Sequence, residues 1–441
     1  MCEDDGSPGS YFVCVSVQSS GGRSASPALL LTGVVLVAIN LRPAAASVGP
    51  LLPRIQSDTG LSNGWAGAFA ALPVLCFGLL APAAPILARR LGAHAAIAIA
   101  MALLLAGQLA RLIPGMGFLF FGTAVAGSAI AIGNVLVPVL VRRDLAGRSG
   151  TSMSLFAATL VGAAALAAGV SVPVADALGG GWRPGLGVWA LPAAVAALAW
   201  LPVLTRGDAP GPDEDFGGSD TPPLRTVTRS ALAWQVTLFF AIQSAGFYAT
   251  LAWLPSIFRS HGYSEADAGL LLSLMLVVGA FTGLIVPGLA RRGRDQRALV
   301  AGCCLPIALG WIGILLWPTS AAYLWVVLLG LGENGAFPLA LMLIVLRGGS
   351  VSSTAGLSTM AQSVGYALAG LAPLAVGALH GLTHSWTPEM ILLLALVLPQ
   401  FLFGLPAGRN RQISAATGPS GAASREPVLA RGEAASRPDV G

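Results

Sequence analysis

The sequence contains no lysine, only four histidines and little charge of either sign. Charged residues make up 10% of its 441 residues, whereas a soluble domain carries about 25%. So few charges cannot cover a surface that is exposed to water. With 55% hydrophobic residues, the composition indicates a protein that crosses a membrane several times.

Other absences exclude whole classes of function. Without lysine the chain cannot contain the Gly-x-x-x-x-Gly-Lys-[Ser/Thr] nucleotide loop, so we expect no ATP-driven step and no cofactor. The net charge of +5 comes without a basic patch interleaved with aromatic residues, so we expect no nucleic-acid partner. We expect no metal site, because metal-ligand spacing is missing among the cysteines Cys2, Cys14, Cys76, Cys303 and Cys304.

Long apolar runs predict twelve transmembrane helices, because each run approaches or exceeds the roughly 20 residues that cross the hydrocarbon core. A polar segment after the sixth run divides the spans into six and six, which is typical of a two-half transporter. We therefore expect an all-α polytopic membrane protein with two pseudo-symmetric six-helix bundles, 28–205 and 230–408. A cytoplasmic linker, 206–229, would join them, with disordered tails at 1–27 and 409–441. The runs are 28–47, 65–88, 94–113, 117–141, 150–177, 185–204, 231–257, 267–290, 298–317, 320–346, 353–379 and 388–407.

Arginine is distributed unevenly along this predicted topology. If both termini lie in the cytoplasm, nineteen of the 24 arginines fall in cytoplasmic segments. The outer loops hold Arg54, Arg111, Arg183 and Arg259, and only Arg42 lies within a span. An excess of arginine inside is the positive-inside signal. Arginine takes the place of lysine throughout, and Ala and Gly are abundant, which suggests a GC-rich bacterial genome. We therefore predict a multi-pass protein of the bacterial cytoplasmic membrane with both ends inside.

The two halves of the chain repeat each other. Helices 1–2, 4 and 5 recur as helices 7–8, 10 and 11. A parallel repeat of six spans implies two similar bundles around an axis along the membrane normal, with the solute site between them. The matched pairs include Pro53 with Pro255, Gly60 with Gly262, Ser62 with Ser264, Asn134 with Asn334 and Pro173 with Pro373.

Arg42, within Asn40-Leu41-Arg42-Pro43, is the only charge of the first apolar run. An arginine at the centre of a bilayer costs from about 2.5 to more than 10 kcal/mol, so it persists only where it faces protein, water or a ligand. We interpret Arg42 as the contact for the charge, or for the carbonyl or nitro dipole, of a small solute. The alternative is an arginine at a helix end that reaches the interface or pairs with a carboxylate.

Several polar side chains on the predicted spans are further candidate solute contacts. Amide and phenol groups can bind a small anion without adding a second buried charge. Asn40 points about 200° away from Arg42 on a regular helix, so packing is the alternative role for Asn40. Helix–helix hydrogen bonding is the alternative for the others. The candidates are Asn40, Asn134, Gln243, Tyr248 and Tyr366.

Glu333 is the one carboxylate predicted to lie well inside a span. Burial favours the protonated form of a carboxyl group. Glu333 is therefore a candidate proton-coupling site or the counter-charge of Arg42. The alternative is that it lies near the outer end of its span and is solvated.

Paired arginines end the second, fourth and eighth spans. They are candidate gate residues and topology anchors: Arg89, Arg90, Arg142, Arg143, Arg291 and Arg292. The loops after the second and eighth spans resemble the Gly-x-x-x-Asp-Arg-x-Gly-Arg loop of the major facilitator superfamily. Both copies depart from this loop, because they lack the aspartate that belongs to its charge relay in the family.

Other stretches resemble the cyanate/2-nitroimidazole permease (CynX/NimT) family within that superfamily, over about residues 28–407. The resemblance implies carriage of a small anionic or neutral nitrogen-containing solute without ATP, by uptake or export. The stretches are Asn40-Leu41-Arg42-Pro43-Ala44, Ser47-Val48-Gly49-Pro50-Leu51-Leu52, Gly133-Asn134-Val135-Leu136-Val137-Pro138, Gln243-Ser244 with Tyr248, and Trp253-Leu254-Pro255.

We therefore expect a secondary transporter that works by alternating access as a monomer, with a small-molecule solute, the lipid bilayer and protons as partners. One alternative is a drug or metabolite exporter of the same fold. Another is a membrane receptor without transport. A membrane-embedded enzyme would need clustered His, Asp or Glu. The four histidines, however, are predicted near loops: His94, His261, His380 and His384.

Overall fold

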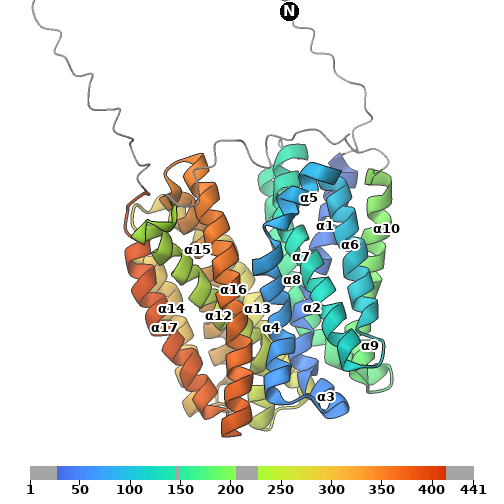
Figure 1. The fold of residues 1–441 in the computed structure, drawn as a ribbon. Coiled ribbons are helices and arrows are strands. Elements are labelled where there is room, and N and C mark those ends of the chain that lie inside the picture. Colours follow the sequence, from blue (N-terminus) through green and yellow to red (C-terminus); the bar gives the residue numbers. More distant parts are fainter. Residues whose placement is uncertain (1–26, 146–148, 205–226, 414–441) are drawn as a thin grey trace, which may run out of the picture.

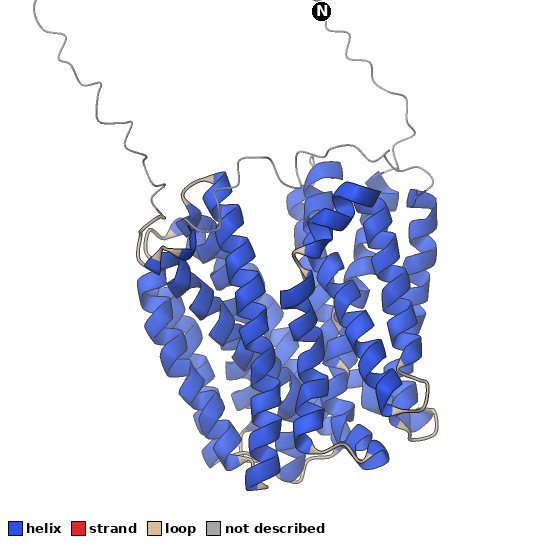
Figure 2. Ribbon diagram, in the orientation of Figure 1, coloured by secondary structure: helices blue, strands red, loops and turns tan. Residues whose placement is uncertain are grey.

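The computed structural model of the protein describes residues 27–145, 149–204 and 227–413. These residues form helices and short connections, with no strand among them (Figure 2). Twelve of the described helical segments are long and apolar enough to cross a membrane, which confirms the predicted number of spans. The predicted tails and linker lie almost entirely outside the described residues.

The helices form two groups that stand side by side (Figure 1). The first group is α1 (Pro27–Leu41), α2 (Pro43–Ala46), α3 (Val48–Thr59), α4 (Asn63–Leu80), α5 (Ala83–Leu91), α6 (Ala93–Ala110), α7 (Met116–Asp144), α8 (Ser149–Ala177), α9 (Trp182–Gly187) and α10 (Ala190–Leu204). The second is α12 (Ala231–Ser260), α13 (Glu265–Arg292), α14 (Arg297–Leu316), α15 (Ala322–Gly348), α16 (Val351–Thr383) and α17 (Thr387–Ala407).

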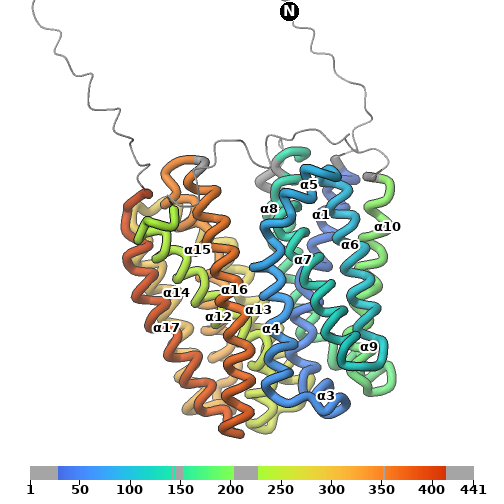
Figure 3. Tube along the Cα trace, in the orientation of Figure 1, coloured from blue at the N-terminus to red at the C-terminus, as the bar shows by residue number. Residues whose placement is uncertain are grey.

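Glycine lets the two groups touch along two pairs of helices, α4 with α16 and α8 with α13 (Figure 3). A Cβ added to Gly67 of α4 would lie 2.6 Å from the Pro373 carbonyl oxygen of α16. One added to Gly269 of α13 would lie 2.7 Å from the Ala168 carbonyl oxygen of α8. Real Cβ atoms do not approach so closely, so any larger residue would push the groups apart. We call this line of contact the seam.

The sequence repeat reappears as repeated local structure. Gly60 and Gly262 both have positive φ, 69° and 93°, which glycine adopts without steric cost. Two residues later, Ser62 and Ser264 both cap a helix, accepting hydrogen bonds from the backbone N–H groups of Trp65 and Asp267. The same turn therefore starts α4 in one half and α13 in the other.

The first span is broken where the sequence places its polar motif. The chain leaves α1 at Leu41, passes through Arg42, and begins the four-residue α2 at Pro43, whose fixed φ suits a first helical position. Ser47 then separates α2 from α3, and its hydroxyl donates to the Pro43 carbonyl at 2.7 Å. The second span is also broken, because α4 ends at Leu80 and α5 begins only at Ala83. The sequence predicts that stretch as one continuous run.

Candidate functional site

A tight pocket lies at the seam and is lined from both groups of helices. Arg42 reaches it from the break between α1 and α2. Two polar side chains, those of Arg42 and Tyr248, lie among its lining residues. The lining residues are Leu41, Arg42, Ala45, Ala46, Phe77 and Ala164 from the first group and Phe247, Tyr248, Leu251 and Leu276 from the second.

The Arg42 guanidinium has no ion-pair partner in the described part of the chain. It lines the same pocket as the Tyr248 phenol. The Tyr366 ring centroid lies 6.3 Å from that of Tyr248. The structure thus places three of the predicted solute contacts, Arg42, Tyr248 and Tyr366, in one cluster that spans the seam.

Aromatic rings surround this cluster. The Tyr248 ring centroid lies 5.3 Å from that of Phe247, and 6.1 Å from that of Phe77 across the seam. The Tyr366 centroid lies 5.8 Å from Phe77 and 5.1 Å from Phe240. All four contacts are edge-to-face, the arrangement that ring quadrupoles favour. The cluster therefore combines one cation with two phenols and further aromatic rings, a combination that suits a small, flat, electron-rich solute.

The other predicted contacts point elsewhere. Asn40 is buried, and its Nδ2 group donates to the Leu36 carbonyl at 2.7 Å and to the Pro192 carbonyl of α10 at 3.0 Å. That is the packing role given above as its alternative. Gln243 is completely buried and donates to the Ser244 hydroxyl at 2.6 Å. Asn134 lies on α7 and is not among the pocket-lining residues.

Glu333 is 2% exposed, so the alternative in which it is solvated is wrong. Its Oε1 atom lies 3.5 Å from the Thr250 hydroxyl of α12, and its Oε2 atom has no hydrogen-bond partner. It faces Gly246 of α12 and forms no ion pair with Arg42. Its role in proton coupling stays a prediction.

Four of the six candidate gate arginines form no ion pair between the two groups of helices in the described residues. Arg89, Arg90, Arg291 and Arg292 are exposed, and in the described residues none of them forms an ion pair. The side chain of Arg142 lies outside the described residues. Their role as a gate stays a prediction.

Arg143 belongs to a charged cluster within the first group. Its Nε atom lies 2.6 Å from Asp144 Oδ1, and His94 Nε2 lies 3.1 Å from Asp144 Oδ2. Burial works to raise the pKa of Asp144, but hydrogen bonds from His94 and Arg143 outweigh it and hold that pKa below its usual value. Asp144 is therefore ionised at neutral pH.

An ion pair that the sequence did not single out does cross the seam. Arg54 of α3 pairs through Nε with Glu265 of α13, and through Nη1 with Asp176 of α8 at 2.7 Å. Arg259 of α12 also pairs with Glu265, at 3.0 Å. All four charges lie at the end of the helices where α3 meets the start of α13, on one side of the pocket.

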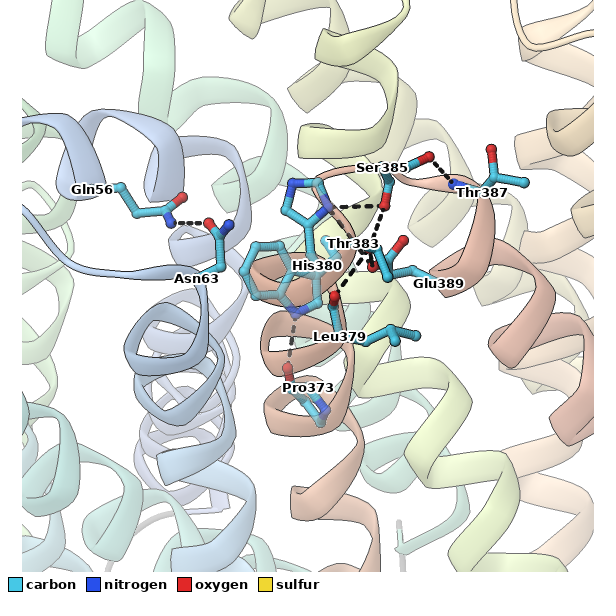
Figure 4. A network of polar contacts seen from close by, with 10 residues as sticks. Gln56, Asn63, Pro373, Leu379, His380, Thr383, Ser385, Thr387 and Glu389 are labelled. Atoms are coloured by element: carbon cyan, nitrogen blue, oxygen red, sulfur yellow. Dashed lines mark hydrogen bonds and ion pairs between the residues drawn. The ribbon is translucent and has the colours of Figure 1, made fainter.

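A polar network closes the same end of α16 (Figure 4). The Trp253 indole donates to the Pro373 carbonyl at 2.9 Å, which fixes α12 against α16. The His380 ring stacks on Trp386 at 3.8 Å, and the Thr383 hydroxyl donates to Glu389 at 3.0 Å. These contacts lie within the second group, whereas the Gln56–Asn63 hydrogen bond that Figure 4 also draws lies within the first.

Arg111 is the residue whose placement the sequence missed. We predicted it in an outer loop, yet its side chain is 0% exposed. Its Nη1 atom donates to the Ala44 carbonyl of α2 and to Gln108 Oε1, both at 3.1 Å. The guanidinium carbon lies 5.7 Å from the centre of the Phe69 ring. Gln108 lies three residues earlier on α6, and residues at that spacing lie on the same face of a helix. This spacing was the sequence signal for the contact between Gln108 and Arg111.

Comparisons with known proteins identify the family. The model of the Major Facilitator Superfamily matches residues 34–370. The 2-nitroimidazole transporter of Escherichia coli is 37% identical, over 87% of this chain and 96% of that protein. The cyanate transport protein CynX of Escherichia coli is 32% identical, over 81% of this chain and 91% of that protein.

Solved structures agree on the fold. A bacterial homologue of the human lysosomal transporter Spinster, in an inward-facing and unoccupied conformation, superposes with a TM-score of 0.71 at 15% identity. It covers 88% of this chain and 98% of its own. The protein is therefore a multi-pass membrane transporter of the major facilitator superfamily, within the group of permeases that includes the 2-nitroimidazole and cyanate transporters.

Proposed function

We propose that the protein carries a small, flat solute that is anionic or rich in nitrogen, with Arg42 as its main contact. The main observation in support of this proposal is that Arg42 lines the seam pocket without a counter-charge in the described residues. Arg42 is partly buried, and a partly desolvated charge without a partner is unfavourable, so a bound anion would offset that cost. The names of the two relatives, a cyanate and a 2-nitroimidazole transporter, point to the same chemistry.

Solute exchange in liposomes tests this proposal. Purified protein is reconstituted without ATP, and the exchange of labelled cyanate or 2-nitroimidazole is followed. A hydrogen bond to a charged group contributes about 1.5–3 kcal/mol, so Arg42→Gln should slow exchange at low solute concentration by at least about tenfold. Arg183→Gln is the matched control, because Arg183 pairs with Asp58 at the surface. Equal exchange by the Arg42→Gln and control proteins would contradict the proposal.

We propose a membrane orientation with both termini in the cytoplasm, supported by the distribution of arginine. The Arg54–Glu265 ion pair then lies at the outer end of the seam, where we propose that it helps to close the pocket from outside. Alternating access would require this pair to open. We also propose that the halves, 28–205 and 230–408, move as two bodies within a monomer.

A drug exporter of the same fold is the second candidate. The observation that favours it is the apolar pocket lining, in which Arg42 and Tyr248 are the polar residues. The two candidates differ in their dependence on charge. If Arg42→Gln abolishes exchange of cyanate, the permease is supported. If the variant spares export of apolar compounds from cells and no anion is carried, the exporter is supported.

A further inference from the structure

Two arginines of the described residues are almost completely buried, and they differ in how they are satisfied. Arg347 is 2% exposed and donates to the carbonyls of Ala407 and Gly408 and to Gln296. Arg111 is 0% exposed, yet its Nε and Nη2 atoms have no partner. Arg347 therefore has the contacts of a structural arginine, whereas Arg111 retains unused donors and an uncompensated charge.

Arg111 touches the segment that carries the main solute contact. Its Nη1 atom holds the Ala44 carbonyl of α2. Ala44 lies between Arg42 and Ala45, which both line the pocket. Asn40 holds the other side of the break by its bond to the Pro192 carbonyl. The break is thus held from behind at two points, and Arg42 is left facing the pocket.

The charge of Arg111 is not cancelled locally. Its partners in the described residues are an amide, a carbonyl and the Phe69 ring, and none of them carries a negative charge. An arginine side chain is not deprotonated in proteins, so the buried guanidinium of Arg111 keeps its charge at neutral pH. In a poorly solvated interior the potential of such a charge extends over several ångströms.

We propose, on the basis of the function proposed above, that Arg111 is a specificity-determining residue for the solute site. Its uncompensated positive charge adds to that of Arg42, so the pocket binds an anion better than a neutral solute of similar shape. Arg111 acts through the pocket wall at α2 and need not touch the solute.

Equilibrium binding of two probes tests the charge effect. One probe is cyanate, and the other is 1-methyl-2-nitroimidazole, which has no acidic N–H group. Arg111→Gln keeps a donor for the Ala44 carbonyl but removes the charge. It should weaken cyanate binding about tenfold relative to the neutral probe, whereas Arg111→Lys should keep the wild-type ratio. Arg183→Gln should change neither probe. Equal weakening of both probes in Arg111→Gln would assign Arg111 a structural role only and overturn the proposal.

A second readout does not depend on the solute. In a background whose five native cysteines are serine, Ala45→Cys places a thiol in the pocket wall. A nearby cation favours the thiolate, so Arg111→Gln should lower the acid dissociation constant of this thiol about tenfold, as read from the pH dependence of its alkylation rate. Arg111→Lys should leave it unchanged. An identical pH profile in Arg111→Gln would overturn the proposal for Arg111. This readout also works if the wild-type protein binds neither probe, which would reject the proposed solutes instead.

Discussion

Arg54 and Glu265 form an ion pair that joins the two groups of helices at one end of the seam. Their side chains are 21% and 16% exposed, so solvent screens the pair only partly. Asp176 and Arg259 extend it on either side. Because this pair lies between the groups, the end where α3 meets α13 cannot open without breaking it.

We predict that Glu265→Gln opens this end more often. Losing a partly exposed ion pair costs about 1 kcal/mol, which is about a fivefold shift between conformations. A cysteine at pocket residue Ala46 should then react several times faster with a thiol reagent that cannot cross the membrane, added from outside. Asp267→Asn is the control, since Asp267 lies on the same helix and accepts only from Ser264. Unchanged reactivity in Glu265→Gln would show that the pair does not hold the seam closed.

Close backbone contact across the seam leads to a second prediction. A Cβ at Gly67 would clash with the Pro373 carbonyl oxygen, whereas a Cβ at Gly64, on the same helix, would meet nothing within 4 Å. Gly67→Ala should therefore lower the thermal unfolding midpoint by several degrees, since overpacking costs about 1–3 kcal/mol. Gly64→Ala should leave the midpoint unchanged or raise it slightly. If both variants unfold alike, the seam is not packed as described.

The fold could be predicted well from the sequence. Apolar runs give the number of spans, and matched pairs such as Ser62 and Ser264 give the repeat, because both patterns are written in local residue types. The role of Arg42 as a pocket residue also followed, since an arginine in an apolar run must face something polar.

The side-chain environments could not be predicted in the same way. Arg111 lies near the end of an apolar run and looks like a loop residue, but its long side chain turns back into the helices. Arg54 looks like an ordinary outer-loop arginine, and its partner Glu265 is more than 200 residues away. Which way a long side chain turns, and which distant residue it meets, depends on packing that neither hydropathy nor spacing records.

Glu333 gives a prediction about coupling. If protons drive transport through this buried carboxyl group, Glu333→Gln should abolish accumulation against a gradient but preserve solute exchange at equal concentrations. Thr250→Val is a useful comparison, because it removes the one hydroxyl within 3.5 Å and leaves the carboxyl group in place. Accumulation driven by a proton gradient in Glu333→Gln liposomes would exclude Glu333 as the coupling site.

The charged cluster around Asp144 gives a prediction about pH. The pKa of Asp144 is lower in the folded protein than its usual value of about 4. Its contribution to stability is therefore present at neutral pH and is lost as the pH falls through the folded-state pKa. Asp144→Asn should lower the unfolding midpoint at pH 7, and the difference from wild type should shrink in acid. A difference that does not depend on pH would contradict this account.

The central claim is that Arg42 binds the solute in the seam pocket, and equilibrium binding to purified protein tests it most directly. Thermal stabilisation by cyanate and by 2-nitroimidazole is measured for wild type, Arg42→Ala and the surface control Arg183→Ala. We predict that the ligand-dependent rise in the unfolding midpoint is lost in Arg42→Ala and kept in Arg183→Ala. An equal rise in Arg42→Ala would remove Arg42 from the binding site.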